Sequence, residues 1–575
     1  MIHQYDIVIV GGGIAGLYTA LTAAANNCQV AVVSKVHVTR SHSVAAQGGI
    51  AASLANEEED HWEWHMYDTI KGSDYLADQD AVEILAKEAP NAIYTLEHLG
   101  VPFSRNAEGK IEQRRFGGHT RNFGEAPMKR ACYVSDRTGR AIMDTLYDQC
   151  LAKGVTFHNE VFIVKLLFSS NRCCGAAGYD IATGIPQVFH AKTIVLATGG
   201  SGKIYQTTSN GFASTGDGFA LALDALLPLE DMEFVQFHPT GIYGMGILIS
   251  EAARAEGGVL RNSLGERFME RYAPTLKDLA PRDIISRAIL KEISEGRGVD
   301  GKDYVYLDLR EIGKERLNQK LPEISSFIKN YLGIDPSEAP VPVAPTCHYM
   351  MGGIPTDVEG HVLMDSAGSV LPGLFAVGEC ACVSVHGANR LGCNSLIDLV
   401  VFGYRTGLSA VKHVKLNDLP PLPQQAESIL IAKINRLIDS KGVERVPILR
   451  EAMQRLMTSN CSVFRDGSNL EQALLQIRQL EKQCLNLGVM NKSRIFNYEL
   501  QEALELSNML RVAEMIVLSA LQRKESRGAH FRNDYPERND EEYLKHTFVN
   551  ETPAGLKESY KPVAIGKFAP EKRRY

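Results

Sequence analysis

The stretch YDIVIV at residues 5–10, followed by GGGIAG at 11–16, decides the fold of the amino-terminal part of the chain. The first six residues are mostly apolar and β-branched, which is typical of a buried parallel strand. The glycine turn then opens a good helix-forming segment, LYTALTAAA at 17–25. A second strand is predicted at QVAVVSK, residues 29–35, so the chain begins with a βαβ unit that binds a dinucleotide.

The glycines of this turn have separate expected roles. Gly11 permits the tight turn, Gly13 lets the backbone approach a pyrophosphate, and Gly16 lets helix and strand pack closely. The helix that starts at Ile14 and Ala15 presents its positive end to phosphate charge. The second strand ends in Ser34-Lys35, without the acidic residue that usually contacts a ribose, which argues against a simple NAD site.

Two later glycine turns indicate a single large dinucleotide. ATGG at 197–200 closes a predicted strand, and TGDG at 215–218 precedes a predicted helix. Gly378-Glu379 follows a third strand-like stretch, LFAVGE at 374–379. No second nucleotide fingerprint is present, so we expect one bound FAD.

Composition excludes several classes of protein. The chain has 575 residues, enough for two to four domains, and a net charge of −7, which gives no reason to expect a nucleic-acid partner. Eleven scattered cysteines form no C-x-x-C pair, so no metal or iron–sulfur ligand set is predicted. We expect a reducing, cytosolic compartment. The sequence suggests neither a signal peptide nor an apolar run long enough for a membrane helix.

The order of sequence patterns predicts four domains. We expect an α/β FAD-binding (Rossmann-like) domain with an inserted α+β capping domain, then a helical-bundle domain and a C-terminal irregular domain. Apolar residues at three- and four-residue spacing predict one face of a helix in the bundle: Ala503, Leu506, Leu510, Ala513, Val517 and Leu521. The predicted boundaries are 1–235 with 346–412 for FAD binding, 236–345 for the cap, 413–528 for the bundle and 529–575 for the tail.

The segment RSHSVAAQGG at 40–49 resembles the flavinylation segment of succinate dehydrogenase and fumarate reductase flavoprotein subunits, the complex II family. Further segments resemble the same family over nearly the whole chain: QFHPTGI (236–242), SEAARAEGG (250–258), NSLGERFM (262–269), PRDIISRAI (281–289), PTCHYMMGGI (345–354), VHGANRLGCNSL (385–396) and HFRNDYPERND (530–540).

The resemblance implies that His42 carries the flavin covalently through its 8α-methyl carbon. Such a substituent withdraws electrons and makes the flavin more oxidising, as desaturation of an unactivated CH₂–CH₂ unit requires. The cofactor residues expected from motif and resemblance together are Gly11, Gly13, Ile14, Ala15, Gly16, Ser34, Lys35, Ser41, His42, Ser43, Gln47, Gly48, Gly49, Ala197, Thr198, Gly199, Asp217, Glu379, Ser395 and Leu396.

Polar residues in the matching segments suit a dicarboxylate, which needs cationic or hydrogen-bonding partners at both ends. The resemblance implies that His238 and Ser250 hold one carboxylate. His348 and Arg390 would hold the other, and the planar fork of Arg390 suits bidentate binding.

The same resemblance assigns proton transfer to Arg282, with Glu251 and Arg254 as the relay to solvent. An arginine is an unusual acid–base group, but neighbouring cations and desolvation lower a guanidinium pKa.

The chain departs from the family at several positions. Ser250 keeps the usual hydroxyl, while Ala252 and Ala255 stand where glycine is common. Cys393 also replaces a common glycine near the expected flavin, and small-residue packing is the simpler interpretation of it.

The resemblance implies oxidation of succinate to fumarate, with electrons passing to an iron–sulfur subunit and then to quinone at a membrane anchor. This places the chain peripherally on the cytoplasmic face of the inner membrane. Gln47 favours succinate oxidation over the reverse reaction of a quinol:fumarate reductase. A soluble L-aspartate oxidase is a competing interpretation, although it lacks the flavin-linking histidine. A non-catalytic flavin-binding assembly subunit is another.

Overall fold

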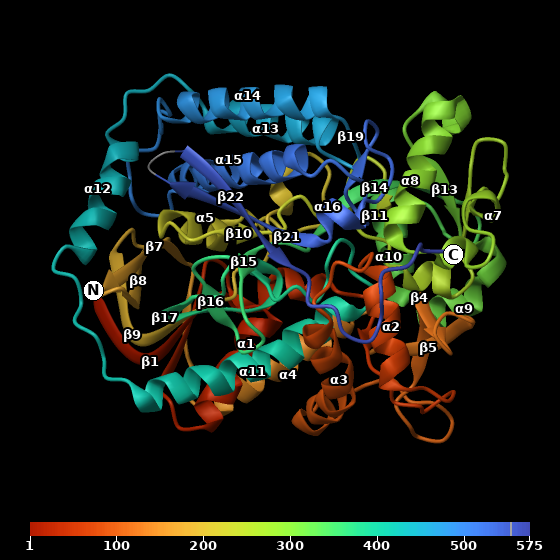
Figure 1. Cartoon of the computed structure of the whole chain (residues 1–575), viewed down its shortest axis with the longest axis horizontal. Coiled ribbons are helices and arrows are strands. Elements are labelled where there is room, and N and C mark those ends of the chain that lie inside the picture. The colour runs from red at the N-terminus through yellow and green to blue at the C-terminus, as the bar shows by residue number, and fades with distance from the viewer. Residues whose placement is uncertain (553–554, 575) are drawn as a thin grey trace.

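The computed structural model describes residues 1–552 and 555–574 of the chain. Its centre is an eight-stranded sheet in the order β16-β17-β9-β1-β2-β6, with β7 and β8 joined to β9 as an antiparallel meander (Figure 1). The strands of this sheet are β1 (Ile2–Val10), β2 (Val30–Ser34), β6 (Thr156–Asn159), β7 (Val161–Ser169), β8 (Arg172–Asp180), β9 (Pro186–Leu196), β16 (His361–Leu363) and β17 (Val370–Ala376).

The predicted βαβ unit is present, and β1 is longer than the sequence suggested. It starts at Ile2 instead of Tyr5 because the long neighbour β9 continues to pair with it, with Ile2 opposite Val188. β1 pairs in parallel with both β2 and β9. The late strand β17 also pairs in parallel with β9, so the chain returns to its first sheet as expected.

Alternate residues of the central strands enter two different cores, which is the period-two behaviour of a doubly covered sheet. Ile7 and Ile9 pack in the core that contains helices α1, α3, α4 and α11, while Val8 and Val10 pack in the core that contains α5, α13, α14 and α15. The helices of the first core are α1 (Ile14–Ala25), α3 (Gln79–Leu99), α4 (Thr138–Ala152) and α11 (Asn394–Leu416). Those of the second are α5 (Asp217–Asp224), α13 (Val446–Asn460), α14 (Gly467–Cys484) and α15 (Tyr498–Gln522).

A second, four-stranded antiparallel sheet carries the inserted segment, in the order β11-β14-β13-β12. Its pairing slips between His238 and Gly241, where Pro239 has no N–H to donate and a register shift is tolerated. The elements of this region are β11 (Val235–Ile242), α6 (Ala252–Ala255), β12 (Val259–Arg261), α7 (Met269–Tyr272), α8 (Arg282–Glu292), β13 (Val305–Asp308), α9 (Lys314–Lys320), α10 (Pro322–Leu332) and β14 (Val341–Met350).

The carboxyl-terminal part is helical and then forms a hairpin. The predicted helix between 503 and 521 is confirmed as part of α15, which follows α12 (Ala426–Ile438), α13 and α14. The tail, in which the sequence showed no helical period, forms α16 (Asp540–Tyr543) and the hairpin of β21 (Lys545–Thr552) and β22 (Gly555–Pro562). β21 also pairs with β10 (Leu229–Glu230), so the tail joins the body of the protein through a sheet.

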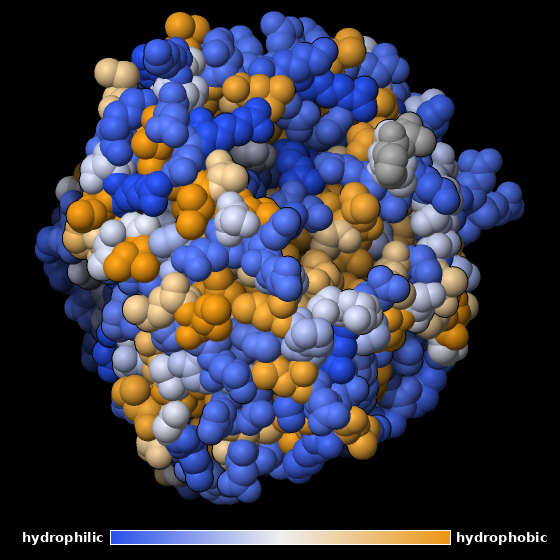
Figure 2. Space-filling view, turned by 90° about the vertical axis from the view of Figure 1, so that its left-hand side faces the viewer, coloured by the Kyte–Doolittle hydropathy of each residue, from blue (hydrophilic) through white to orange (hydrophobic). Residues whose placement is uncertain are grey.

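The remaining α-helix and strands of the described residues lie outside these groups. They are α2 (Trp62–Gly72), β3 (Ile50–Ala51), β4 (Gln113–Arg121), β5 (Ala126–Cys132), β15 (Ile354–Pro355), β18 (Ala381–Cys382), β19 (Phe464–Arg465) and β20 (Phe531–Arg532). Within residues 1–552 and 555–574, none of the helices has the length and apolar character needed to span a bilayer. On the side of the molecule seen in Figure 2, hydrophilic and hydrophobic residues are interspersed.

Candidate active site

The glycine turn forms one wall of a cavity between the two sheets. Gly11 has a φ of +121°, and a Cβ on it would lie 2.0 Å from the carbonyl oxygen of Ala197. A Cβ on Gly16 would lie 2.1 Å from the carbonyl oxygen of Gly11, so helix and strand can approach this closely only with glycine. α1 begins after Gly13, which provides no side-chain cap, and the Ile14 N–H donates to Oγ of Ser43 at 3.3 Å. Gly13, Ile14 and Ala15 line the cavity, so the positive end of the helix faces it.

The cavity has a volume of about 880 Å³ and continues from this turn to the predicted substrate residues. It is lined by all the predicted cofactor residues except Gly16, which packs behind Gly11. His238, Ser250, Arg282, His348 and Arg390 line the same cavity. Residues predicted for two ligands therefore share one continuous space.

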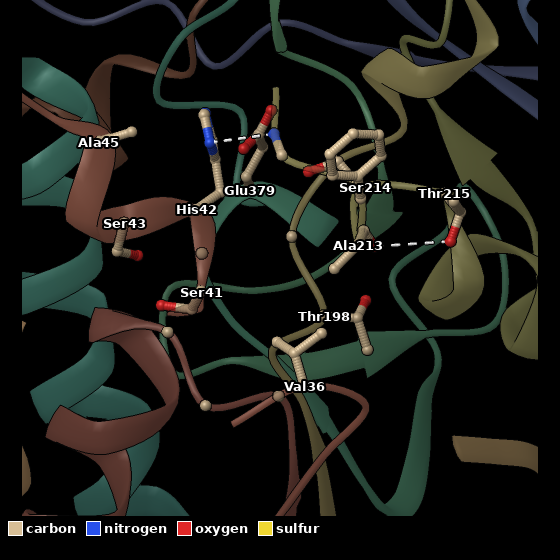
Figure 3. A pocket seen from close by; sticks show the side chains of 18 of the residues that line it. Val36, Ser41, His42, Ser43, Ala45, Thr198, Ala213, Ser214, Thr215 and Glu379 are labelled. Atoms are coloured by element: carbon tan, nitrogen blue, oxygen red, sulfur yellow. Dashed lines mark hydrogen bonds between the residues drawn. The ribbon is translucent and has the colours of Figure 1, made fainter. Parts of the chain in front are cut away.

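The His42 imidazole projects into this cavity from the short turn His42–Ala45, facing the loop that holds Ala213, Ser214 and Thr215 (Figure 3). The backbone N–H of Gly211 donates to Nδ1 at 3.3 Å, and the Asn210 amide lies 3.2 Å from Nε2. Burial, together with the charge of Lys203, lowers the pKa of His42 to about 4. The imidazole is therefore neutral, and a neutral ring is the form that acts as a nucleophile.

Lys35 stands at the position where an acidic ribose contact is usual. Two carboxylates balance its positive charge. Its ammonium lies 2.6 Å from Asp217 and 2.9 Å from Glu505 of α15. Burial alone would lower the pKa of Lys35, but the two carboxylates outweigh it and raise the pKa. Asn508, also on α15, donates to Asp217 at 2.9 Å. The helical region thus completes this end of the cavity.

At the other end two histidines lie close together, with their ring centres 5.1 Å apart. Burial and the positive charge of Arg282 hold the pKa of both His238 and His348 well below its usual range. The backbone N–H of Thr240 donates to Nδ1 of His238 at 3.2 Å, which puts the ring proton on Nε2. That Nε2 has no partner among the described residues and is available to a carboxylate.

Two arginines converge on one amide oxygen. Nη1 of Arg282 donates to Oε1 of Gln236 at 2.9 Å, and Nη2 of Arg390 donates to the same atom at 3.2 Å. Nε of Arg390 is buried without a hydrogen-bond partner in the part of the chain described. Burial, then the charge of Arg282, lowers the pKa of Arg390 to about 10. Arg390 forms no ion pair among the described residues, as expected for an anion site, whereas Arg282 is paired with Glu251.

The predicted proton relay lies directly behind Arg282. Nε of Arg282 donates to Oε2 of Glu251 at 3.0 Å, and Nη2 of Arg254 lies 3.7 Å from the same oxygen. Glu251 and Arg254 do not line the cavity and are 1% and 0% exposed in their side chains. Glu251 and Arg254 are thus a buried ion pair behind Arg282 and not an ion pair on the surface. Burial lowers the pKa of Arg254, and the charge of Arg282 adds to this.

Cys393 is packed with apolar neighbours and lines the cavity, which agrees with the packing interpretation. It adopts a φ of +65° immediately before α11, a conformation that favours glycine. Burial raises the pKa of its thiol, so the sulfur stays protonated.

The cavity contains buried polar atoms that a bound FAD could satisfy. Oε1 of Gln47 and Oγ1 of Thr198 are buried and have no partner within residues 1–552 and 555–574. Burial raises the pKa of Glu379 to about 7, so this cavity-lining carboxyl can be protonated and donate a hydrogen bond. Donors and acceptors thus line the cavity between the glycine turn and His42, as a flavin dinucleotide requires.

The sequence interpretation missed three contributors: Gln236, Asn210 and Glu505. Gln236 could have been found, because it lies two residues before His238 on a strand and so shares its face. Asn210 and Glu505 are brought to the site by loops and domains distant in sequence, and the local pattern carries no signal for them.

Comparisons with known proteins agree with this geometry. The FAD binding domain family matches residues 6–396, and the fumarate reductase flavoprotein C-terminal family matches residues 450–575. The succinate dehydrogenase flavoprotein subunit of Rickettsia bellii is 49% identical, over 99% of this chain and 97% of that protein. The mitochondrial succinate dehydrogenase [ubiquinone] flavoprotein subunit of Oryza sativa subsp. japonica is 45% identical, over 100% of this chain and 93% of that protein.

A solved structure supports the same family assignment. A quinol fumarate reductase chain of E. coli superimposes with a TM-score of 0.92 at 36% identity, covering 100% of this chain and 99% of that one. The full-length match confirms the predicted resemblance and fold class. The chain therefore belongs to the FAD-dependent oxidoreductase family of succinate dehydrogenase and fumarate reductase flavoprotein subunits.

Proposed function

We propose that this chain is the flavoprotein subunit of a succinate:quinone oxidoreductase and oxidises succinate to fumarate. The observation that carries the proposal is the convergence of Arg282, Arg390 and two neutral histidines on the cavity that also contains His42. Such a cation-rich, desolvated end suits a dicarboxylate, and the cofactor end suits FAD. FAD, when bound, supplies the hydride acceptor.

The chain's own residues bind and orient the substrate. Nε2 of His238 and the hydroxyl of Ser250 would hold one carboxylate, while His348 and Arg390 hold the other. Because both histidines are neutral, they donate hydrogen bonds without adding full charge. The positive charge near the second carboxylate stabilises the enolate-like character that develops when a proton leaves the adjacent carbon.

Proton removal is assigned to Arg282. Its guanidinium is held by Gln236 and Glu251, and Arg390 bonds to the same Gln236 oxygen. Glu251 and Arg254 then form the relay that carries the proton away from the cavity. The geometry supports this order because Glu251 contacts both arginines through a single oxygen.

His42 would hold the flavin covalently through its 8α-methyl carbon. Two observations support this: the neutral ring, and the donation by Gly211 to Nδ1. The Asn210 amide nitrogen faces Nε2, so hydrogen-bond donors approach both ring nitrogens and orient the imidazole in the cavity. The 20 predicted cofactor residues remain part of this proposal, as does the division of the chain into four domains.

The electrons would pass to an iron–sulfur subunit, then through a membrane anchor to quinone. We place the chain peripherally on the cytoplasmic face of the inner membrane. Gln47 at the cofactor supports net succinate oxidation over fumarate reduction. These assignments rest on the family and on the lack of cluster or haem ligand spacing in the sequence.

The test is an anaerobic titration of the purified flavoprotein with succinate, while flavin absorbance is recorded. Succinate should bleach the oxidised flavin, and fumarate should restore the absorbance of the reduced protein. L-Aspartate serves as the comparison substrate, since bleaching by L-aspartate alone would indicate an oxidase of that amino acid. An intact flavin that neither dicarboxylate nor L-aspartate bleaches would indicate a non-catalytic flavin-binding subunit.

A further inference from the structure

An arginine near the carboxyl terminus joins two carboxylates from distant parts of the chain. Nη2 of Arg573 lies 2.7 Å from Oδ2 of Asp283 and 3.0 Å from Oδ2 of Asp74. The side chains are 9%, 0% and 8% exposed, respectively. This bridge is therefore largely removed from water, where removal of one partner leaves uncompensated charge.

The tail reaches this position by a long path over the molecule. It leaves the hairpin at β22 and runs to the side where α8 and α10 lie (Figure 1). On the way Ala564 donates its N–H to Asp78 at 2.7 Å, and Phe568 exchanges hydrogen bonds with Gln79. The tail is thus fixed to the first part of the chain before it meets Asp283.

The carboxylate that Arg573 binds is next to the proposed proton-transfer arginine. α8 begins with Arg282 and Asp283, and these consecutive residues point to different surroundings: Arg282 to the cavity, Asp283 to the tail. Asp283 also accepts from Arg287 at 2.9 Å, and Arg287 donates to the carbonyl of Gly528 at 2.8 Å. Contacts with residues outside the inserted segment therefore hold the first two turns of α8 in place.

Asp74 provides the fixed side of the bridge. Its carboxylate also accepts from the N–H of Gly528 at 2.9 Å and from Arg538 at 2.9 Å. Burial would raise the pKa of Asp74, but the charges of Arg573 and Arg527, the Gly528 N–H and the charge of Arg538 lower it. Asp74 is therefore charged. Since it lies just after α2, the bridge links the start of α8 to the end of α2.

We propose that Arg573 is a positioning residue, which holds the first turn of α8 so that Arg282 stays aligned with Glu251 and Gln236. The inference rests on the proposed role of Arg282 in proton transfer. Release of Asp283 would let the start of α8 move, and displacement of a catalytic group by about 1 Å costs up to about a hundredfold in rate. The dicarboxylate contacts of His238, His348 and Arg390 lie on other elements and would be less affected.

The test compares Arg573→Gln with Arg574→Gln in the full-length flavoprotein with its flavin. Arg574 is the adjacent, exposed arginine and makes the matched control. We expect R573Q to lower kcat for succinate with an artificial electron acceptor by about tenfold or more, with a much smaller change in KM. Hydrogen exchange of the backbone amides at the start of α8 should rise in R573Q, while R574Q resembles the unaltered protein in all three measurements.

Partial recovery of kcat by Arg573→Lys would support the bridge, because a lysine can still bind one carboxylate. Unchanged kcat and unchanged exchange at α8 in R573Q would overturn the proposal, and so would equal effects of R574Q.

If R573Q loses its flavin, the comparison passes to Asp283→Asn and the double variant. Their effects on α8 exchange must then be non-additive, and additive effects would reject the bridge. Hydrogen exchange reports on the bridge even if the unaltered protein does not oxidise succinate, so failure of the proposed function is recognised separately.

Discussion

Arg282 donates a hydrogen bond from Nε to Oε2 of Glu251 across 3.0 Å, and the Glu251 carboxylate is 1% exposed. Oε1 of the same carboxylate accepts from the backbone N–H of Gly117 at 2.6 Å. A Cβ at position 117 would lie 2.1 Å from that oxygen, so the residue there must be glycine for the carboxylate to fit. This single group therefore orients Arg282 and would be the first acceptor along the proposed relay.

Glu251→Gln keeps the size of the side chain and removes its charge. We expect turnover of succinate to fall by about a hundredfold or more, which is the usual contribution of a positioned proton-transfer group. Fumarate binding, measured by the shift in flavin absorbance, should change little because the carboxylate contacts lie elsewhere. Glu256→Gln is the matched control, since Glu256 pairs with the exposed Arg316 at 2.9 Å. Equal losses in both variants would contradict a relay role for Glu251.

His42→Ala tests the covalent flavin. Ultraviolet fluorescence of the denatured, gel-resolved chain should be present in the unaltered protein and absent in the variant. The variant should still bind FAD in the native state, because the glycine turn and the start of α1 are unchanged. His37→Ala, a substitution at an exposed position on the cavity wall, should retain the fluorescence. A fluorescent band in His42→Ala would place the bond on another residue, and an unaltered protein without fluorescence would exclude a covalent flavin.

The dinucleotide turn could be predicted from the sequence because its geometry leaves no alternative to glycine at Gly11 and Gly16. Helix α15 could also be predicted, since its apolar period is long and regular. The pairing of Lys35 could not be predicted from local sequence patterns. Its partner Glu505 lies in a different region of the chain, and only the packed fold brings the two side chains together. The tail hairpin likewise could not be predicted from the sequence, because β22 is largely exposed and lacks an alternation of apolar and polar residues.

Glu505→Gln tests whether the helical region contributes to FAD retention. Loss of its charge leaves Lys35 with Asp217 alone, so the ammonium competes for the carboxylate that we assign to the cofactor. In a His42→Ala background, where FAD is not tethered, we expect the Kd for FAD to rise by about tenfold, equivalent to about 1.4 kcal/mol. Glu514→Gln is the control on the same helix, because Glu514 pairs with Arg478 at 2.6 Å and does not line the cavity. An unchanged Kd in Glu505→Gln would show that the charge of Glu505 does not contribute to FAD binding.

His546 on β21 is a buried cation that attaches the tail hairpin to the body of the protein. Nδ1 lies 2.6 Å from Asp231 and Nε2 lies 3.1 Å from Asp78, while Glu230 is 3.5 Å away. Lys561 of β22 approaches the same cluster through Asp78 at 2.8 Å. Burial alone would lower the pKa of His546, but the charge of Asp231 and the hydrogen bonds with Asp231 and Asp78 raise it to about 10.

The raised pKa fixes the sign of the pH dependence. An unfolded histidine titrates near pH 6.5, so the stabilisation from this group is complete below that pH and is lost as pH rises through about 10. His546→Gln should therefore lower stability at pH 6 by about 3–5 kcal/mol, the typical cost of removing one partner of a buried ion pair. The thermal-unfolding midpoints of the variant and the unaltered protein should converge between pH 7 and pH 10. His61→Gln, at a half-exposed imidazole, should leave both the midpoint and its pH dependence unchanged. A gap between His546→Gln and the unaltered protein that stays constant up to pH 10 would mean that the charge on His546 does not hold the hairpin.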